Sequence, residues 1–459
     1  MVRLTTKDIA AQHDPRRYHV LPPPQIAGTV DGDENALSRA YSDVDGVQRK
    51  DCQLGVTPLV VQRLTVLGVA NDINYVVRGL AIAMRDKVRG QLLLLPPIHT
   101  PEGRNAKWSG DRTSLVTGRS IDRAWHWLDG LPGASHRSVF WPSACQELLE
   151  DTERERLLAF DMLARNSSIS VAAARVGLGS SVIDAAMSTR MLARGMPLSD
   201  IPVSYRDHGV LWWWQVLTTY TVRVRGLLAQ RVRSHPALLA LVDSCASRRD
   251  SATTRTQSRW LHLGRQALSR ATRRTSSDLG WAPSLAFDAG LHVRMGDACG
   301  PRARRHQMEV RKCVPTLREG LAPLLAQDVV PRGGRLFLAT DSPQIVEEAR
   351  AMAASLPFEV HFLAFNRSKY DTEAWIELAS AAARSQIQIL EETVLDLLLL
   401  SRARYIAGSM YGNVPRLALQ LRPTAPGDRR RLAYITTDGR DWCSKPTCMS
   451  NNTPTGRFW

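Results

Sequence analysis

Short apolar stretches alternate with amphipathic segments through the second half of the chain. Runs of consecutive apolar residues are typical of buried strands, and apolar residues that recur every three or four positions are typical of helices. The expected strands are residues 285–293, 335–341, 360–365 and 405–407. The expected helices are residues 309–325, a segment that begins at Ser342 and Pro343, and residues 372–383, 393–400 and 414–421. This alternation predicts a mostly parallel, doubly wound α/β sheet.

The first half carries the same pattern more sparsely. Residues 64–68 are predicted as a strand, residues 73–84 as a helix and residues 91–95 as a second strand, which together make a βαβ unit. Further helices are expected at residues 145–164, 170–193 and 211–228. The last helix contains Trp212, Trp213 and Trp214, and three adjacent side chains cannot share one helix face. We therefore expect some of them to pack under this lobe and others to reach the lobe interface.

The length of the chain calls for more than one folded lobe. A chain of 459 residues exceeds the size of one ordinary hydrophobic core, so two α/β lobes are expected. We place them at residues 56–246 and 281–437. Three polar segments remain: a flexible stem or arm at residues 1–55, a basic connector at residues 247–280 and a C-terminal tail at residues 438–459.

The charge balance is strongly basic. A net charge of +16 and a pI near 10.0 favour polyanionic partners, namely nucleic acid, an acidic membrane or a phosphorylated substrate. A biased composition spread over a solvated surface explains the charge equally well. The basic connector lacks the aromatic and glycine motif of a nucleic-acid-binding module, so nucleic acid is not the expected partner.

Targeting signals and cysteines give a weak indication of the compartment. No apolar stretch is long enough for a membrane span, and the first residues lack the apolar core of a signal peptide. Glycosylation-type triplets at Asn166, Asn366 and Asn451 favour the secretory pathway, with the Golgi lumen as the expected location, and a cytoplasmic location follows only for a complete chain. Of seven cysteines, two pairs are close enough in sequence for local disulfides, although free buried thiols fit equally well. These pairs are Cys299 with Cys313 and Cys443 with Cys448.

Polar groups gather where the predicted strands of the second lobe end. The first strand runs into His292, Arg294 and Asp297, the second ends at Asp341, and the fourth is followed by the turn from Gly408 to Asn413. The carboxyl ends of parallel strands line one crevice, so these groups can meet around a single ligand.

The chemistry of these groups fits a phosphate-bearing ligand. Arg294 neutralises a pyrophosphate, and the first amides of the helix after the turn make a further anion site. Asp341 and Asp396 accept from a base or ribose, or hold the arginine in place. Simple structural roles are the alternative: Asp341 caps its helix, Asp396 sits in a first helical turn, and Arg294 pairs with Asp297. In the first lobe, Asn71 faces a ligand or only completes the turn after its strand.

Three strings of residues carry a resemblance to a known family. HVRMGD, FLATDSP and LDLLLLSRARYIAGSMYGNVPRLALQL resemble, in this order, the three motifs of the GDP-fucose-dependent fucosyltransferase superfamily, which groups α1,6-, α1,2- and protein O-fucosyltransferases. The first lobe is similar more weakly, around Gly68 to Asn71 and around Leu211 to Trp213.

The resemblance implies a GT-B architecture, with two Rossmann-like lobes facing across a cleft. It implies GDP-fucose as the donor substrate, a glycan or glycoprotein as the acceptor, inversion at the anomeric carbon, and no metal or other cofactor. Position by position, His292 and Arg294 correspond to the histidine and the donor-phosphate arginine of the first motif, and Asp297 to its carboxylate. The donor site is completed by Asp341 from the second motif and by Asp396, Ser409, Tyr411, Gly412 and Asn413 from the third.

Several positions depart from the α1,6 branch. Met295 replaces a second arginine, Ser342 a second aspartate, and Tyr411 with Gly412 a pair of serines. Ala298 and Arg302 stand where that branch has a lysine and a glutamate, so the general base stays open between Asp297, His292 and Glu309. Two rivals to an inverting fucosyltransferase stay open as well: a transferase of the same architecture that uses another nucleotide sugar, and a nucleotide- or glycan-binding protein with a decayed site.

Overall fold

A computed structural model of the chain forms two compact units. The five-stranded unit draws on Ala229–Ala381 and Glu391–Ser444, and the three-stranded unit draws on Glu34–Leu228 and Ala382–Leu390. The structure describes residues 32–53, 56–63, 69–95, 140, 142–151, 182–184, 201–222, 224, 226–247, 287–295, 299, 314–370, 383–410, 412–421 and 433–437. The predicted connector at 247–280 and tail at 438–459 lie outside these residues, except for Ser247.

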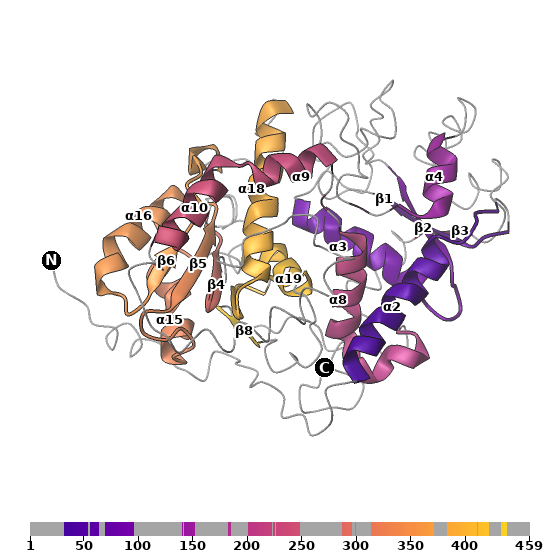
Figure 1. The fold of residues 1–459 in the computed structure, drawn as a ribbon, viewed down its shortest axis with the longest axis horizontal. Coiled ribbons are helices and arrows are strands. Elements are labelled where there is room, and N and C mark those ends of the chain that lie inside the picture. Colours follow the sequence, from indigo (N-terminus) through magenta and orange to yellow (C-terminus); the bar gives the residue numbers. More distant parts are fainter. Residues whose placement is uncertain are drawn as a thin grey trace. The chain divides into compact units, whose positions relative to one another are not determined.

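The five-stranded unit is built on a fully parallel sheet (Figure 1). Its strands are β4 (Ala289–Val293), β5 (Arg335–Thr340), β6 (Glu359–His361), β7 (Tyr405–Gly408) and β8 (Ala433–Thr436). The spatial order is β6-β5-β4-β7-β8, so the chain moves outwards from β4 in both directions. The predicted α/β class and the parallel sheet are confirmed for this unit.

Helices cover this sheet and supply its core. They are α9 (Gly226–Arg233), α10 (Pro236–Ser247), α15 (Leu317–Ala326), α16 (Pro343–Met352), α18 (Ala383–Ser401) and α19 (Asn413–Gln420), with the short 3-10 helices η8 (Ala353–Ser355) and η9 (Arg367–Tyr370). α15 packs on β4 and β8, α16 on β5 and α19 on β7. Leu291, Leu321, Leu338 and Ile345 lie in the buried cluster between sheet and helices, which is where apolar side chains contribute most to stability.

Several boundaries in this unit differ from the sequence-based expectation. α15 begins at Leu317 rather than at Glu309, because the Thr316 side chain accepts a hydrogen bond from the Glu319 amide and caps the helix. β6 ends at His361, where its pairing with β5 ends. α18 begins ten residues before the expected start at Thr393, and β8 was not expected. The expected helix at residues 372–383 lies outside the described residues except for Ala383.

The three-stranded unit contains a second parallel sheet, with the order β2-β1-β3 (Figure 1). Its strands are β1 (Leu59–Arg63), β2 (Gln91–Leu95) and β3 (Val182–Asp184), and α3 (Val69–Ala83) joins β1 to β2. The predicted βαβ unit is confirmed, although its first strand precedes the expected residues 64–68, which lie outside the described part. α3 lies close to the sheet at Gly79, where a Cβ would be 2.9 Å from the Cβ of Gln62.

Two helix predictions in this unit are wrong. β3 lies inside the segment 170–193 that was expected to be helical, and it pairs with Leu59–Val61 of β1. The expected helix 211–228 is divided into α8 (Gly209–Thr221) and α9 by Val222, which has extended backbone angles and bridges to Phe140. α8, which follows η6 (Val203–His208), is buried on almost all sides, so all three tryptophans are 8% exposed or less.

A helix also lies within the segment expected to be a flexible arm, residues 1–55. α2 (Gly32–Gln48) buries one face through Ala36, Ala40, Val44 and Gln48, which recur every four residues. Because most of these residues are small, the stripe gives only a weak helix signal in the sequence. The expectation of a flexible arm is therefore corrected for residues 32–48.

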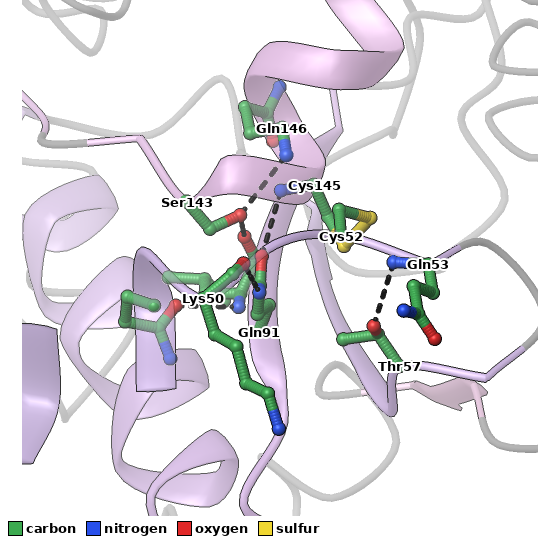
Figure 2. Close-up of a disulfide and its surroundings, with 10 residues drawn as sticks. Lys50, Cys52, Gln53, Thr57, Gln91, Ser143, Cys145 and Gln146 are labelled. Carbon is green, nitrogen blue, oxygen red and sulfur yellow. Dashed lines mark hydrogen bonds between the residues drawn. A yellow bond between two sulfur atoms is a disulfide. The ribbon is translucent and has the colours of Figure 1, made fainter. Parts of the chain in front are cut away.

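A disulfide joins Cys52 to Cys145, next to the start of α4 (Ala144–Asp151). Figure 2 shows this disulfide beside Gln91, whose amide donates to the Lys50 carbonyl at 2.6 Å while its oxygen accepts from the Cys145 amide at 2.8 Å. The pairing was not expected, because the two cysteines are 93 positions apart. Cys299 is also disulfide-bonded, and Cys313, Cys443 and Cys448 lie outside the described residues.

Within the described part of the chain, no helix is both long and apolar enough to cross a membrane.

Candidate functional site

The five-stranded sheet reverses its strand order at β4. Within the sheet, β5 and β6 lie on one side of β4, and β7 and β8 lie on its other side. In doubly wound sheets, ligands bind in the crevice outside the carboxyl ends of the strands at such a reversal. We call the edge formed by the carboxyl ends of β5, β4 and β7 the switch edge.

Strand register brings three of the predicted site residues to the switch edge. Two register pairs mark its position: Val293 with Thr340, and His292 with Gly408. Arg294, Asp341 and Ser409 follow directly after these pairs. Because the three strands are parallel and adjacent, these three residues leave the sheet at the same edge.

Asp341 connects the ends of β4 and β5. Its Oδ1 accepts a hydrogen bond from the Met295 amide at 2.8 Å. The helix after β5 is capped by Ser342, whose side chain accepts from the Ile345 amide, so Asp341 is not needed for this role. The Ser342 hydroxyl also lies 3.3 Å from the Met295 sulfur. Asp341 thus fixes the backbone immediately after Arg294.

His292 and Arg294 differ in their electrostatic state. His292 is 8% exposed, and burial lowers its pKa to about 3, with a smaller contribution from the positive charge of Arg294. The imidazole is therefore neutral near pH 7 and offers one donor and one acceptor. Arg294 is half-buried, and its carbonyl accepts from the Val314 amide at 3.1 Å. The backbone of Arg294 is therefore held at the switch edge, where its side chain supplies positive charge.

The turn after β7 leads into the start of α19. The Gly412 amide donates to the Ser409 carbonyl at 2.9 Å, and Gly412 is the N-cap residue of α19, with no side-chain cap. Asn413 is the first residue of that helix. Gly408 allows β7 to end close to β4, since a Cβ there would lie 3.1 Å from the His292 carbonyl oxygen. Because Pro415 has no N–H, the first three positions of α19 offer only the amides of Asn413 and Val414, and amides at a helix start favour an anion.

Asp396 lies in the middle of α18, which excludes the first-turn role considered for it. Its Oδ1 is buried and has no hydrogen-bond partner, although the residue as a whole is half-buried. Burial raises its pKa to about 8, while the positive charge of Arg367 acts in the opposite direction. Glu392 and Asp341 are close enough to contribute to the increase. Asp396 is thus electrostatically coupled to the switch edge.

Sequence reasoning missed the charged residues around Asp396. Arg367 in η9 donates from Nε to the Thr340 carbonyl at 2.8 Å, so it is anchored on the last residue of β5. The Tyr370 hydroxyl donates to Glu392 Oε2 at 2.6 Å, and the pKa of Tyr370 is raised by burial and then by Glu392. An arginine in a loop without a motif gives no sequence signal, and only the fold brings it to this place.

Four of the candidates from the sequence have side chains that are not described. Asp297 and Tyr411, as well as Glu309, lie outside the described residues. Asn71 lies in the first turn of α3, in the three-stranded unit, and its side chain is not described. Among the described residues, no group of three or more His, Cys, Asp or Glu side chains is placed to hold a metal ion.

Comparisons with known proteins find similarity among solved structures alone. No protein-family model matches the sequence, and no curated protein is detectably similar to it. Among solved structures, the chain is similar to NodZ α1,6-fucosyltransferase soaked with GDP-fucose, with 13% identity and a TM-score of 0.34 over 80% of this chain and 93% of the other. Because this TM-score is low for chains that share a fold, we argue the function from this chain's own residues.

Proposed function

We propose that the chain is an inverting, metal-independent glycosyltransferase that moves fucose from GDP-fucose to a glycan or glycoprotein. The observation that carries this proposal is the switch edge. The cation of Arg294, the carboxylate of Asp341 and the helix start after Gly412 all lie at the carboxyl ends of adjacent parallel strands. This combination suits a nucleoside diphosphate, which carries a pyrophosphate between a base and a sugar.

The same groups account for catalysis without a metal. When the bond between fucose and GDP breaks, negative charge develops on the departing diphosphate. Arg294 and the first amides of α19 stabilise that charge, and Asp341 holds the backbone next to Arg294 through the Met295 amide. His292, neutral at physiological pH, hydrogen-bonds the donor without adding charge.

The acceptor hydroxyl needs a general base. A base with a pKa of about 3 is too weak to accept a proton efficiently near neutral pH, which argues against His292 in this role. Asp297 and Glu309 are the remaining candidates from the sequence, and we favour Asp297 because it lies three positions after Arg294.

The proposal includes a GT-B arrangement and a secretory location. The presence of a parallel sheet in each of the two units supports two Rossmann-like lobes, with the three-stranded unit on the acceptor side. Disulfides persist in oxidising compartments, so the Cys52–Cys145 pair supports the secretory pathway.

The first test removes the cation of Arg294. Arg294→Ala is expected to lower fucose transfer to a panel of glycan acceptors by about 100- to 1,000-fold, because one donor to the developing charge is lost. Arg350→Ala, on the exposed surface of α16, is the matched control and keeps full turnover. If Arg294→Ala turns over as fast as the control, the assignment of the site is wrong.

A second test needs no acceptor. A ligand bound only by the native protein raises the unfolding midpoint, so millimolar GDP is expected to raise it and UDP to raise it less. A larger shift with UDP supports the rival donor. A GDP shift without transfer or donor hydrolysis supports the rival of a decayed binding protein.

A further inference from the structure

Arg367 is a buried arginine with an unused donor. The side chain is 3% exposed, and its Nε and Nη1 donate to the carbonyls of Thr340 and Phe365 at 2.8 and 3.4 Å. Its guanidinium carbon lies 5.3 Å from the centre of the Phe365 ring. Nη2 is buried and has no hydrogen-bond partner. A buried N–H without an acceptor costs free energy, so this position favours a ligand that brings one.

Asp396 supplies the complementary group. Its Oδ1 is buried without a partner, as is Arg367 Nη2, and the two side chains influence each other electrostatically. One offers a hydrogen-bond donor and the other an acceptor. Arg367 is anchored on the last residue of β5, and the hydrogen bond from Tyr370 in η9 to Glu392, one turn before Asp396 on α18, places η9 beside this part of α18.

The bases of nucleotides differ in how well they satisfy such a pair. Guanine presents a carbonyl oxygen, a ring N–H and an exocyclic amine in a row, so it brings one acceptor for a guanidinium and two donors for a carboxylate. Adenine places an amine where guanine has its carbonyl, and uracil lacks the exocyclic amine. Guanine therefore fits the pair best.

We propose that Arg367 determines the base specificity of the donor site, donating from Nη2 to the carbonyl oxygen of guanine while the unpaired Oδ1 of Asp396 accepts from the exocyclic amine. This inference rests on the proposed function, and it adds a residue that no sequence motif marks. The Nε contact with Thr340 fixes the guanidinium relative to the switch edge, so the base and the pyrophosphate are held at a set spacing.

Binding measurements on the full chain test the role of Arg367. Calorimetric titrations compare GDP, IDP and ADP on the wild type and on Arg367→Gln. IDP keeps the carbonyl oxygen and loses only the amine, so the variant is expected to weaken GDP and IDP equally, by about 10- to 100-fold, and to leave ADP unchanged. Asp396→Asn is expected to weaken GDP more than IDP.

Two controls separate recognition from folding. Arg350→Gln, an exposed arginine on α16, is the matched substitution and leaves all affinities unchanged. If Arg367→Gln does not fold, the wild type alone still gives an answer. The 2,6-diaminopurine riboside diphosphate places an amine against Arg367 and is expected to bind at least about 10-fold more weakly than GDP.

The outcomes distinguish this inference from the proposed function. If the wild type binds no nucleoside diphosphate, the donor site itself is overturned, and the inference with it. If the wild type prefers GDP but Arg367→Gln keeps the same ratio of GDP to ADP affinity, only the inference is overturned, and an ordered water satisfies Nη2 instead. Equal affinity for GDP and the diaminopurine analogue overturns it in the same way.

Discussion

Buried polar side chains have different roles around the disulfide and at the switch edge. Around the disulfide of the three-stranded unit, Gln48, Gln91 and Gln146 are each 2% exposed or less, and each bonds to backbone groups of a neighbouring segment. Gln48 donates to the Gly90 carbonyl at 2.9 Å and accepts from the Leu92 amide at 2.8 Å. These glutamines tie α2 and α4 to β2, and their hydrogen bonds are completed inside the protein.

At the switch edge of the five-stranded unit, the pattern is different. Arg367 is as deeply buried and carries a charge, yet one of its nitrogens has no partner, and the same holds for one oxygen of Asp396. Burying such groups unsatisfied costs more than burying a satisfied amide. Buried polar groups without partners at one edge of a sheet are available to a ligand. Buried side chains whose hydrogen bonds are made within the protein have a structural role instead.

The largest expected effect concerns the disulfide. Replacing both Cys52 and Cys145 with Ser is expected to lower the free energy of unfolding by about 4 kcal/mol, because the cross-link closes a loop of 93 residues in the unfolded chain. Urea unfolding followed by tryptophan fluorescence measures the change. GDP binding is expected to survive at a temperature where the variant is folded. Equal stability of the two proteins would show that the glutamine contacts hold this segment without the cross-link.

The next prediction concerns the completed hydrogen bonds. Gln48→Leu leaves the Gly90 carbonyl and the Leu92 amide without partners, so it is expected to cost about 2 to 3 kcal/mol. Gln53→Leu is the matched control, because the side chain of Gln53 is exposed, and it changes the free energy of unfolding by less than about 0.5 kcal/mol. Similar effects for the two variants would contradict a structural role for the buried glutamine.

Much of the five-stranded sheet could be predicted because its signals are local. Each strand is a short apolar run, and Ser342 followed by Pro343 marks a helix start that the structure confirms. The shared edge of Arg294 and Asp341 follows from a general rule for parallel strands, so it too could be predicted.

What could not be predicted depends on contacts between distant parts of the chain. α2 has a stripe of small residues that resembles a polar linker until Ala36 and Ala40 are seen to be buried. Proximity in sequence favoured other cysteine pairs over Cys52 with Cys145. Arg367 lies 26 residues beyond Asp341, in a loop without a motif, and it reaches β5 only through tertiary structure.

An effect of similar size is expected from the proton on Asp396. Because burial raises its pKa from 3.8 to about 8, the folded protein binds one proton more than the unfolded chain between these values. The contribution of Asp396 to stability is therefore largest at low pH and falls as pH rises, by about 1.4 kcal/mol per pH unit within this window. Asp396→Asn is expected to remove this slope, as measured by urea unfolding at pH 5.5, 6.5 and 7.5.

The control for this substitution is Asp328→Asn, which removes an exposed carboxylate from the loop after α15. If Asp396→Asn and the control have the same pH dependence, Arg367 keeps Asp396 ionised in the folded protein. Its unpaired oxygen would then belong to a buried ion pair rather than to a proton-carrying group, and the contrast with the satisfied glutamines would weaken.

The smallest effect is expected at the surface of the three-stranded unit, where polar contacts are made in water. Arg89 donates two hydrogen bonds to Asp43, at 2.8 and 3.0 Å, and its side chain is 42% exposed. Arg89→Ala is expected to cost no more than about 1 kcal/mol in free energy of unfolding, because exposed ion pairs contribute little. The backbone of Arg89 has φ of 41°, which favours glycine. Arg89→Gly is therefore expected to be at least as stable as Arg89→Ala in urea unfolding, and a less stable glycine variant would mean that this conformation carries no strain.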